Sequence, residues 1–358
     1  MAIAFDVLAS VWAMVSEMEV VGDSPRLTLM VYVALLGAVV LVTSLPSAAW
    51  STFVIEKRFG FFTGSIWLWL GDTAKSAVVA GVIGLPLALA LDAALAWGST
   101  SGSAYLYAWA VLVSASVVLL FAHPRLIAPC FNTFTPASDA LLARITTVAN
   151  KAGFPLGEVM VMDGSRMSNH SNAYMYGMCS AKRIVLFDTL LDQVDQDGVV
   201  AILGHEMGHY VLGHTWWNLI IVQAYALGFL YAFSQAMAWP GLVEAFGFGF
   251  GFGADGSAGD LPPHLIRLVV FSFLAVPVDA AVSLGMHMLS RKFEYDADAY
   301  AVDLGLDLVP PLQALHRENK SMSDPHPLYS AYHYTHPPVT ERVAAIKARM
   351  EARGRKTQ

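Results

Sequence analysis

Long runs without charged side chains dominate the pattern of hydrophobic and polar positions along this chain. An apolar run of about 18 or more residues is long enough to cross a bilayer as a helix. Residues 1–17 are apolar but shorter, and they predict an interfacial helix or the tail of a longer span. The pattern predicts five membrane-spanning helices, at residues 28–49, 76–97, 104–123, 213–238 and 265–288.

The pattern changes between the third and fourth predicted spans. The segment DALLARITTVANKAG (139–153) has a helical apolar period and ends at a glycine, which is a helix stop signal. EVMVMDG and RIVLFDTLL, which follow, are typical of strands. We therefore expect a membrane all-α bundle of five to six transmembrane helices with a small α+β module packed against it.

The composition supports this fold class. Of the 358 residues 56% are hydrophobic and only 14% are charged, whereas soluble domains have about 25% charged residues. The net charge of −7 is modest, and no basic cluster indicates a nucleic-acid partner. Cys130 and Cys179 indicate no disulfide framework, and no cleavable signal peptide is evident at the N-terminus.

Lysine and arginine are unevenly distributed among the connecting segments. The loops at 98–103 and 237–263 have none, whereas the other connections and the C-terminal segment are basic. By the positive-inside rule the basic segments face the cytosol, and the glycine-rich loop FGFGFGFGADGSAGD (246–260) faces the opposite side. Five spans then place the N-terminus on the luminal side and the C-terminus in the cytosol.

Polar side chains lie beside an apolar span in the segment Gly204–His214, which reads GHEMGHYVLGH. His205 and His209 are four residues apart, so both imidazoles lie on one helical face and can share a zinc ion at about 2.1 Å each. Glu206 is then placed to act as the general base on water. The alternative is a coincidental pair of histidines inside a helix bundle.

A catalytic zinc usually has three protein ligands. His214 follows His209 by five residues, which turns it away from the ligand face of a continuous helix. Glu294 in SRKFEYDADAYA is a better third ligand, and Asp298 on the same helical face could accept the second imidazole N–H of a ligand. Taken alone, these two acidic residues are also typical of a solvated charged face.

Six segments together resemble the zinc-dependent, multi-spanning CaaX prenyl proteases. They are STFVIEKRFGF, DGSRMSNHSNAYMYG, KRIVLFDTLL, GHEMGHYVLGHT, LSRKFEYDADAYA and YHYTHPPVTER. The resemblance implies a ring of transmembrane helices that encloses a hydrated chamber, with the zinc site of a metallopeptidase module at its cytosolic end. Members of this family usually have seven spans, of which this sequence shows five.

The resemblance also implies a role for each matching residue. His205, His209 and Glu294 would bind one Zn²⁺ per chain, with Glu206 as the general base and Asp298 beside a ligand. The residues implied to act on the substrate are Asn172, which would bind an extended peptide, and His336 and Arg342, which would face the tetrahedral intermediate.

The implied function is removal of the last three residues of prenylated CaaX proteins, in the endoplasmic reticulum membrane with the active site facing the cytosol. The implied partners are the prenylated substrate and membrane lipid. Three alternatives are a membrane quality-control metalloprotease, a non-enzymatic lipid- or peptide-binding chamber, and a transporter, the last because Asp92 and Asp279 lie in apolar spans.

The chain is expected to divide into four parts. These are 1–123 (membrane helices), 124–200 (substrate-binding part), 201–290 (helices including HExxH) and 291–358 (third ligand and HPP segment).

Overall fold

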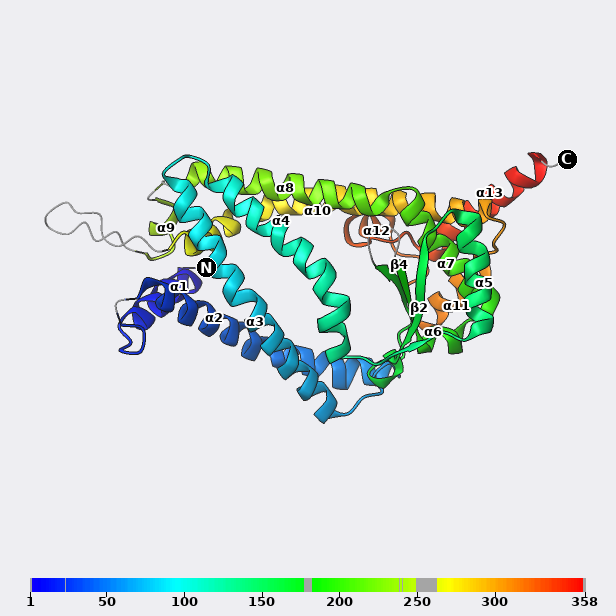
Figure 1. The fold of residues 1–358 in the computed structure, drawn as a ribbon, viewed down its shortest axis with the longest axis horizontal. Helices are drawn as coiled ribbons and strands as arrows, with labels where there is room; N and C mark the ends of the chain where they lie inside the picture. The colour runs from blue at the N-terminus through cyan, green and yellow to red at the C-terminus, as the bar shows by residue number, and fades with distance from the viewer. Residues whose placement is uncertain are drawn as a thin grey trace, which may run out of the picture. The chain divides into compact units, whose positions relative to one another are not determined.

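The computed structural model describes residues 2–22, 24–176, 182–237, 239, 241–248 and 263–356. Within these ranges, five helices have the length and apolar composition to cross a membrane, which confirms the predicted number of spans. Most of the 246–260 loop lies outside the described residues. The helices are α1 (Ala2–Ser16), α2 (Pro25–Trp50), α3 (Ile66–Ser99), α4 (Ala104–Ala122), α5 (Asp139–Ala152), α6 (Asp188–Gln193), α7 (Gln196–Val211), α8 (His214–Ala236), α9 (Gly241–Glu244), α10 (His264–Asp303), α11 (Val309–Glu318), α12 (Pro327–His333) and α13 (Val339–Lys356) (Figure 1).

Several spanning helices continue well past their apolar cores. A π-helical segment, Ser51–Glu56, prolongs α2, and α10 continues through the polar sequence FEYDADAYA to Asp303. Pro46, Pro86 and Pro277 lie inside these helices. Proline is tolerated there because the surrounding helices of a membrane protein can satisfy the freed backbone groups.

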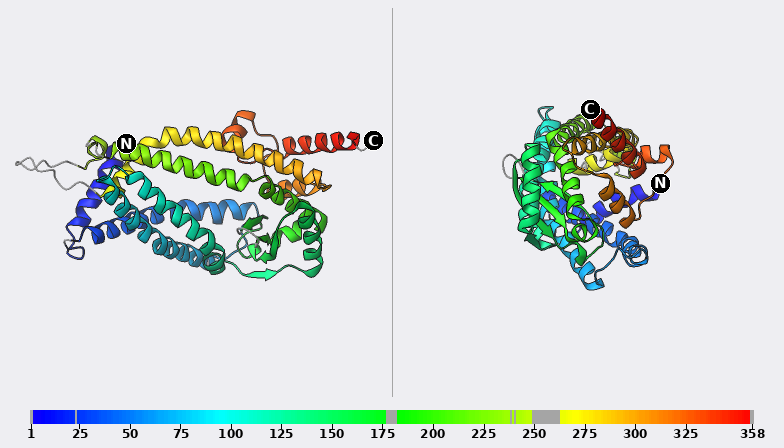
Figure 2. Two further views of the ribbon diagram at one scale, coloured as in Figure 1. Left: turned by 45° about the horizontal axis from the view of Figure 1, so that its top comes forward. Right: turned by 90° about the vertical axis from the view of Figure 1, so that its right-hand side faces the viewer.

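The chain forms two compact units, each assembled from three separate segments. The first unit comprises residues 1–51, 71–119 and 220–278. In it α8 and α10 lie side by side (Figures 1 and 2), where Phe229 and Phe233 approach Phe271 with ring centroids 5.3 and 5.6 Å apart.

Asp92 of α3 also belongs to the first unit. Its Oδ1 accepts a hydrogen bond of 2.9 Å from the backbone N–H of Leu265, at the first turn of α10. Carboxylates satisfy the unpaired N–H groups of helix starts. The Asp92 side chain thus caps the start of α10, which is a structural role for a carboxylate within an apolar span.

The second unit comprises residues 52–70, 120–219 and 279–358, and its described part contains a four-stranded sheet in the order β1-β2-β4-β3. The central pair β2–β4 is parallel and the outer pairs are antiparallel, so β3 lies at an edge. The strands are β1 (Phe134–Pro136), β2 (Leu156–Met162), β3 (Ala173–Tyr176) and β4 (Lys182–Phe187).

The predicted helix and strands of this module are present, with one correction. RIVLFDTLL is a strand only as far as Phe187, and its second half begins the helix α6. Asp188 disfavours extended structure, and its Oδ1 instead accepts hydrogen bonds from the backbone N–H groups of Ser165 and Thr189 at 2.9 and 2.8 Å. The boundary between strand and helix therefore lies inside one apolar run, so the hydrophobic pattern alone does not reveal it.

The core of the second unit lies between the sheet and the helices α5 and α7. One face of α5 is buried through Leu141, Ile145 and Ala149, with the helical spacing that the sequence predicts. Helix α5 begins at the N-cap Ser138 and ends at Gly153, whose φ of 66° lies in the left-handed region that glycine favours. This packing fixes α7, the helix that contains the HExxH sequence.

Candidate active site

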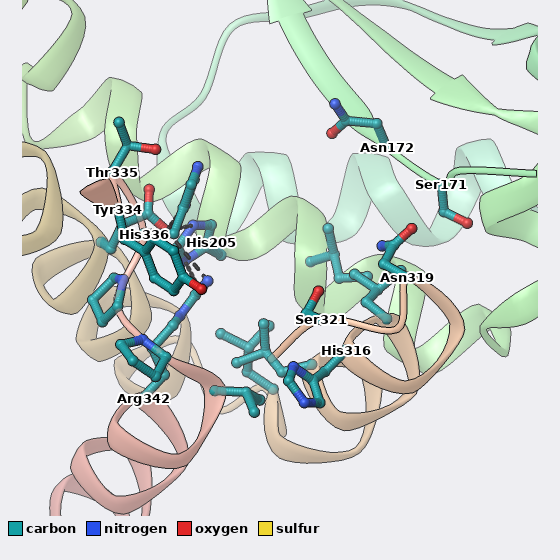
Figure 3. Close-up of a pocket in the computed structure, with 18 of the residues that line it drawn as sticks. Ser171, Asn172, His205, His316, Asn319, Ser321, Tyr334, Thr335, His336 and Arg342 are labelled. Atoms are coloured by element: carbon teal, nitrogen blue, oxygen red, sulfur yellow. Dashed lines mark hydrogen bonds and ion pairs between the residues drawn. The ribbon is translucent and has the colours of Figure 1, made fainter. Parts of the chain in front are cut away.

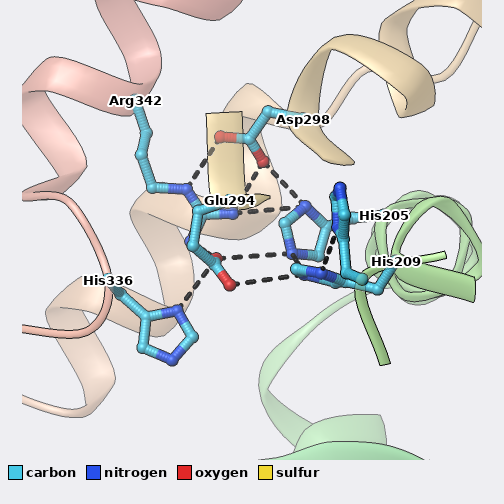
Figure 4. Close-up of polar contacts among 7 residues, drawn as sticks. His205, His209, Glu294, Asp298, His336 and Arg342 are labelled. Atoms are coloured by element: carbon cyan, nitrogen blue, oxygen red, sulfur yellow. Dashed lines mark hydrogen bonds and ion pairs between the residues drawn. The ribbon is translucent and has the colours of Figure 1, made fainter. Parts of the chain in front are cut away.

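Two helices of the second unit provide the candidate metal ligands. His205 and His209 lie one turn apart on α7, and Glu294 lies on α10. Gly208 allows the two helices to approach closely, because a Cβ at this position would lie only 3.2 Å from the Cα of Ala297. The close approach places the α7 imidazoles directly opposite the Glu294 carboxylate (Figure 4).

The ligand atoms have the spacing that a tetrahedral metal site requires. Nε2 of His205 and Nε2 of His209 are 3.2 Å apart. The Glu294 carboxylate lies 3.5 Å from the first through Oε2 and 3.3 Å from the second through Oε1. Two ligands bound tetrahedrally to zinc at about 2.1 Å are separated by about 3.4 Å. Within the described residues, this is the set of His, Cys, Asp and Glu side chains whose ligand atoms could hold a metal ion.

Burial and charge also favour a cation at this position. His205 and Glu294 are buried, and Oε2 of Glu294 has no well-oriented hydrogen-bond donor among the described residues. Ring nitrogens of His205 and His336 and a guanidinium nitrogen of Arg342 lie within 3.5 Å of it. Burial lowers the pKa of His205, but hydrogen bonds to Asp298 and Glu294 outweigh this effect and raise the pKa to about 9. The site thus stabilises positive charge between its carboxylates, and its donor set suits a divalent metal ion.

Asp298 links two of the predicted residues to each other. Its Oδ1 lies 2.8 Å from Nδ1 of His205, the ring nitrogen that faces away from the other ligands. Both of its oxygens also accept hydrogen bonds from Arg342 of α13, at 2.6 and 2.8 Å. Burial lowers the pKa of Arg342, but the contact with Asp298 outweighs it and raises the pKa above its ordinary value.

His336 and Arg342 both approach the third candidate ligand. Nδ1 of His336 lies 2.8 Å from Oε2 of Glu294, and Nη1 of Arg342 lies 3.3 Å from the same oxygen. The His336 side chain is 66% exposed, whereas Arg342 is buried. Pro337 and Pro338 restrict the backbone that follows His336. The structure thus brings both residues of the HPPVTER segment to the candidate metal centre.

A pocket of about 620 Å³ opens beside this centre, and Glu206 and Asn172 both line it. Figure 3 shows His205, His336 and Arg342 at one end of the pocket, and Asn319, Ser321 and His316 at the other end.

Of the two predicted residues in the pocket, Asn172 is exposed and directly precedes the edge strand β3. Burial raises the pKa of the Glu206 carboxyl above that of an ordinary glutamate. All eight residues predicted for the site therefore lie at the centre, in the pocket or in direct contact with them.

Several residues of the site were not predicted from the sequence. Leu308, Leu312 and Leu315 form an apolar wall of the pocket. Their spacing by four and three residues would have indicated one face of a helix. His214, which the sequence predicts to lie outside the ligand set, has its Nδ1 3.0 Å from Nδ1 of His209.

Comparisons with known proteins account for nearly the whole chain. Residues 137–350 match the sequence model of peptidase family M48. Residues 1–133 match a second model, described as the CAAX prenyl protease N-terminal region with five membrane helices. The first match contains the HExxH sequence, Glu294 and the HPPVTER segment.

Individual relatives agree with these matches. A CAAX prenyl protease 1 homolog of Arabidopsis thaliana is 42% identical over 85% of this chain and 70% of its own length. The Homo sapiens homolog is 34% identical over 86% of this chain and 70% of its own length. The crystal structure of S. mikatae Ste24p matches with a TM-score of 0.87 and 32% identity, over 96% of this chain and 81% of that chain. The chain therefore belongs to the CaaX prenyl proteases of peptidase family M48 and is a multi-pass membrane metalloprotease.

Proposed function

We propose that this protein is a zinc endopeptidase that removes the last three residues of prenylated CaaX proteins. The observation that supports it best is the set of three ligand atoms with tetrahedral spacing beside a pocket that an edge strand borders. The relatives named as CAAX prenyl proteases support the substrate class.

His205, His209 and Glu294 would hold one zinc ion per chain. The two imidazoles and one carboxylate leave room for a fourth position, as catalytic zinc sites do. Bound zinc would polarise the scissile carbonyl and lower the pKa of water. Asp298 would fix the ring of His205 by accepting its Nδ1–H.

Glu206 would be the general base. It accepts a proton from the attacking water and later delivers that proton to the leaving amine. Its pKa is raised by burial, which brings it closer to the working pH and suits a group that must both accept and release a proton.

His336 and Arg342 would stabilise the negative charge that develops on the carbonyl oxygen. Both present N–H groups at the pocket end nearest Glu294, and donors aimed at developing charge lower the barrier of acyl transfer. The ion pair with Asp298 holds the Arg342 guanidinium in one orientation, so little reorganisation is needed during the reaction.

Asn172 and β3 would hold the peptide in an extended conformation. An edge strand presents unpaired backbone groups to which a further strand can add. Within the described part of the chain β3 pairs with β4 on one side only, so its other side can receive the substrate. The lipid of the substrate and the surrounding membrane lipid would be the other partners.

The localisation we propose is the endoplasmic reticulum membrane, with the active site on the cytosolic side. The basic segments that support this orientation include the region of the α+β module and the chain after Arg291. A cytosolic prenylated protein could then present its C-terminus to the pocket. A membrane quality-control protease is the second candidate, since it would share the HExxH site but would not require a prenyl group.

The experiment that separates these two functions compares a farnesylated CaaX peptide with the same peptide lacking the lipid. Purified protein in detergent is incubated with each, and the products are identified by mass spectrometry. We expect release of the C-terminal tripeptide from the farnesylated peptide and little from the other. Equal cleavage of both, or cleavage at other bonds, would support the quality-control function instead.

A further inference from the structure

His214 is buried, and it lies against one of the candidate metal ligands. The residue is 4% exposed, and its Nδ1 is 3.0 Å from Nδ1 of His209. On its other side the imidazole stacks on Phe293, with ring centroids 4.1 Å apart and planes inclined by 9°. His214 is thus buried and held between a candidate ligand and an aromatic ring.

A break in the helix brings His214 to this position. In a continuous helix a residue five positions after His209 would point about 140° away from it. In the structure α7 ends at Val211 and α8 begins at His214, with Gly213 between them at a φ of 74°. This left-handed turn redirects the chain and returns His214 to the ring of His209.

The positions of the ring nitrogens define the direction of the hydrogen bond. Nε2 of His209 faces His205 and Glu294 at 3.2 and 3.3 Å, so it is the metal-facing atom. A neutral imidazole that offers Nε2 as a ligand carries its hydrogen on Nδ1. Nδ1–H of His209 then donates to Nδ1 of His214, which must accept.

We propose that His214 is a positioning residue of the metal centre, a neutral imidazole that accepts the Nδ1–H of His209 and orients its ring. His205 has a carboxylate, Asp298, in the corresponding place. The two histidine ligands are thus held by different partners, one charged and one neutral. Groups that orient metal-bound histidines affect metal affinity by roughly 10–100-fold. The proposal rests on the metal site proposed above and is independent of the substrate.

Three variants separate the hydrogen bond from packing. His214→Phe keeps an aromatic ring on Phe293 but loses the acceptor, and His214→Leu serves the same purpose if the Phe variant does not fold. His214→Asn keeps an acceptor at the position of Nδ1 but loses the ring. Phe293→Leu is the control, because it removes the stacking partner and leaves the hydrogen bond intact.

Zinc affinity is measured for each full-length protein in detergent by competition with a chromophoric chelator, and kcat and KM are measured alongside. We expect zinc affinity roughly 10–100-fold weaker for His214→Phe, and close to wild type for His214→Asn and Phe293→Leu. Wild-type affinity in His214→Phe would overturn the positioning role. Equal losses in the Phe and Asn variants would show that the ring shape matters rather than the acceptor. Absence of zinc binding by the wild type would instead overturn the metal site itself.

Discussion

The Glu206 side chain lines the pocket beside the candidate ligands but does not belong to the ligand set. Glu206→Gln preserves its shape and removes its ability to accept a proton. We expect zinc content and folding to stay unchanged while kcat falls by roughly 10²–10⁴-fold, the usual contribution of a general base. Metal analysis and peptide turnover of the purified variant check this. Turnover within about tenfold of wild type would show that another group is the base.

Arg342 and Arg349 offer a matched comparison of two ion pairs between α13 and α10. Arg342 pairs with the buried Asp298, and Arg349 pairs with the exposed Asp303. Removing Arg342 takes the guanidinium away from the buried Asp298 and leaves His205 as its remaining partner. Breaking a buried ion pair in this way costs up to roughly 3–5 kcal/mol. Removing Arg349 leaves a carboxylate that water can solvate.

We therefore expect Arg342→Ala to lower the thermal unfolding midpoint strongly and Arg349→Ala to change it little. Circular dichroism of both variants in the same detergent provides the measurement. A similar midpoint for the two variants would mean that the Arg342–Asp298 pair does not hold the site together.

At the scale of whole elements, the junction between α7 and α8 depends on the left-handed backbone of Gly213. A Cβ at this position meets no atom within 4 Å, so the cost of Gly213→Ala is conformational and amounts to about 1–2 kcal/mol. We expect reduced stability and weaker zinc binding, because His214 shifts with the turn.

Gly228→Ala in the middle of α8 is the control for this variant. Its Cβ also meets no atom within 4 Å, and Gly228 is helical, where alanine is the better residue. If both substitutions had the same effect on unfolding and zinc affinity, the junction would have no special role.

The elements differ in how far the sequence could predict them. The spans could be predicted because a backbone in lipid must satisfy its own hydrogen bonds, which leaves a helix as the solution for a long apolar run. The start of α6 could not be found by hydrophobicity, because the signal was a single residue, Asp188, within an apolar segment. The order of the strands depends on long-range pairing that no local pattern reveals.

The candidate site could be predicted to the level of its residues but not of all its contacts. The four-residue spacing of Glu294 and Asp298 correctly indicated a shared helical face, and the structure adds that Asp298 contacts His205 rather than His209. The contact of His214 could not be predicted from helical periodicity, because the helix breaks between His209 and His214. Gly213, the residue just before it, was the available sign that the helix ends.

At the scale of the whole molecule, the predicted topology places the basic connections and the C-terminus on one side of the membrane. The loop at 98–103 should lie on the opposite side. The test uses Ser101→Cys and Ala352→Cys, one at a time, in a chain whose Cys130 and Cys179 are replaced by serine. A membrane-impermeant thiol reagent should label these two positions from opposite sides. Labelling of both from the same side would contradict the five-span topology and the cytosolic active site.

The enclosing chamber that the family resemblance implies stays a prediction, whereas the metal centre is built within one compact unit. The proposed catalytic role depends on the binding of one zinc ion by His205, His209 and Glu294. The most direct measurement is the zinc content per chain of purified wild-type protein and of Glu294→Ala, by inductively coupled plasma mass spectrometry. The wild type should contain about one zinc per chain and Glu294→Ala far less, since a catalytic site needs three protein ligands. Full zinc content in Glu294→Ala, or none in an active wild type, would contradict the account.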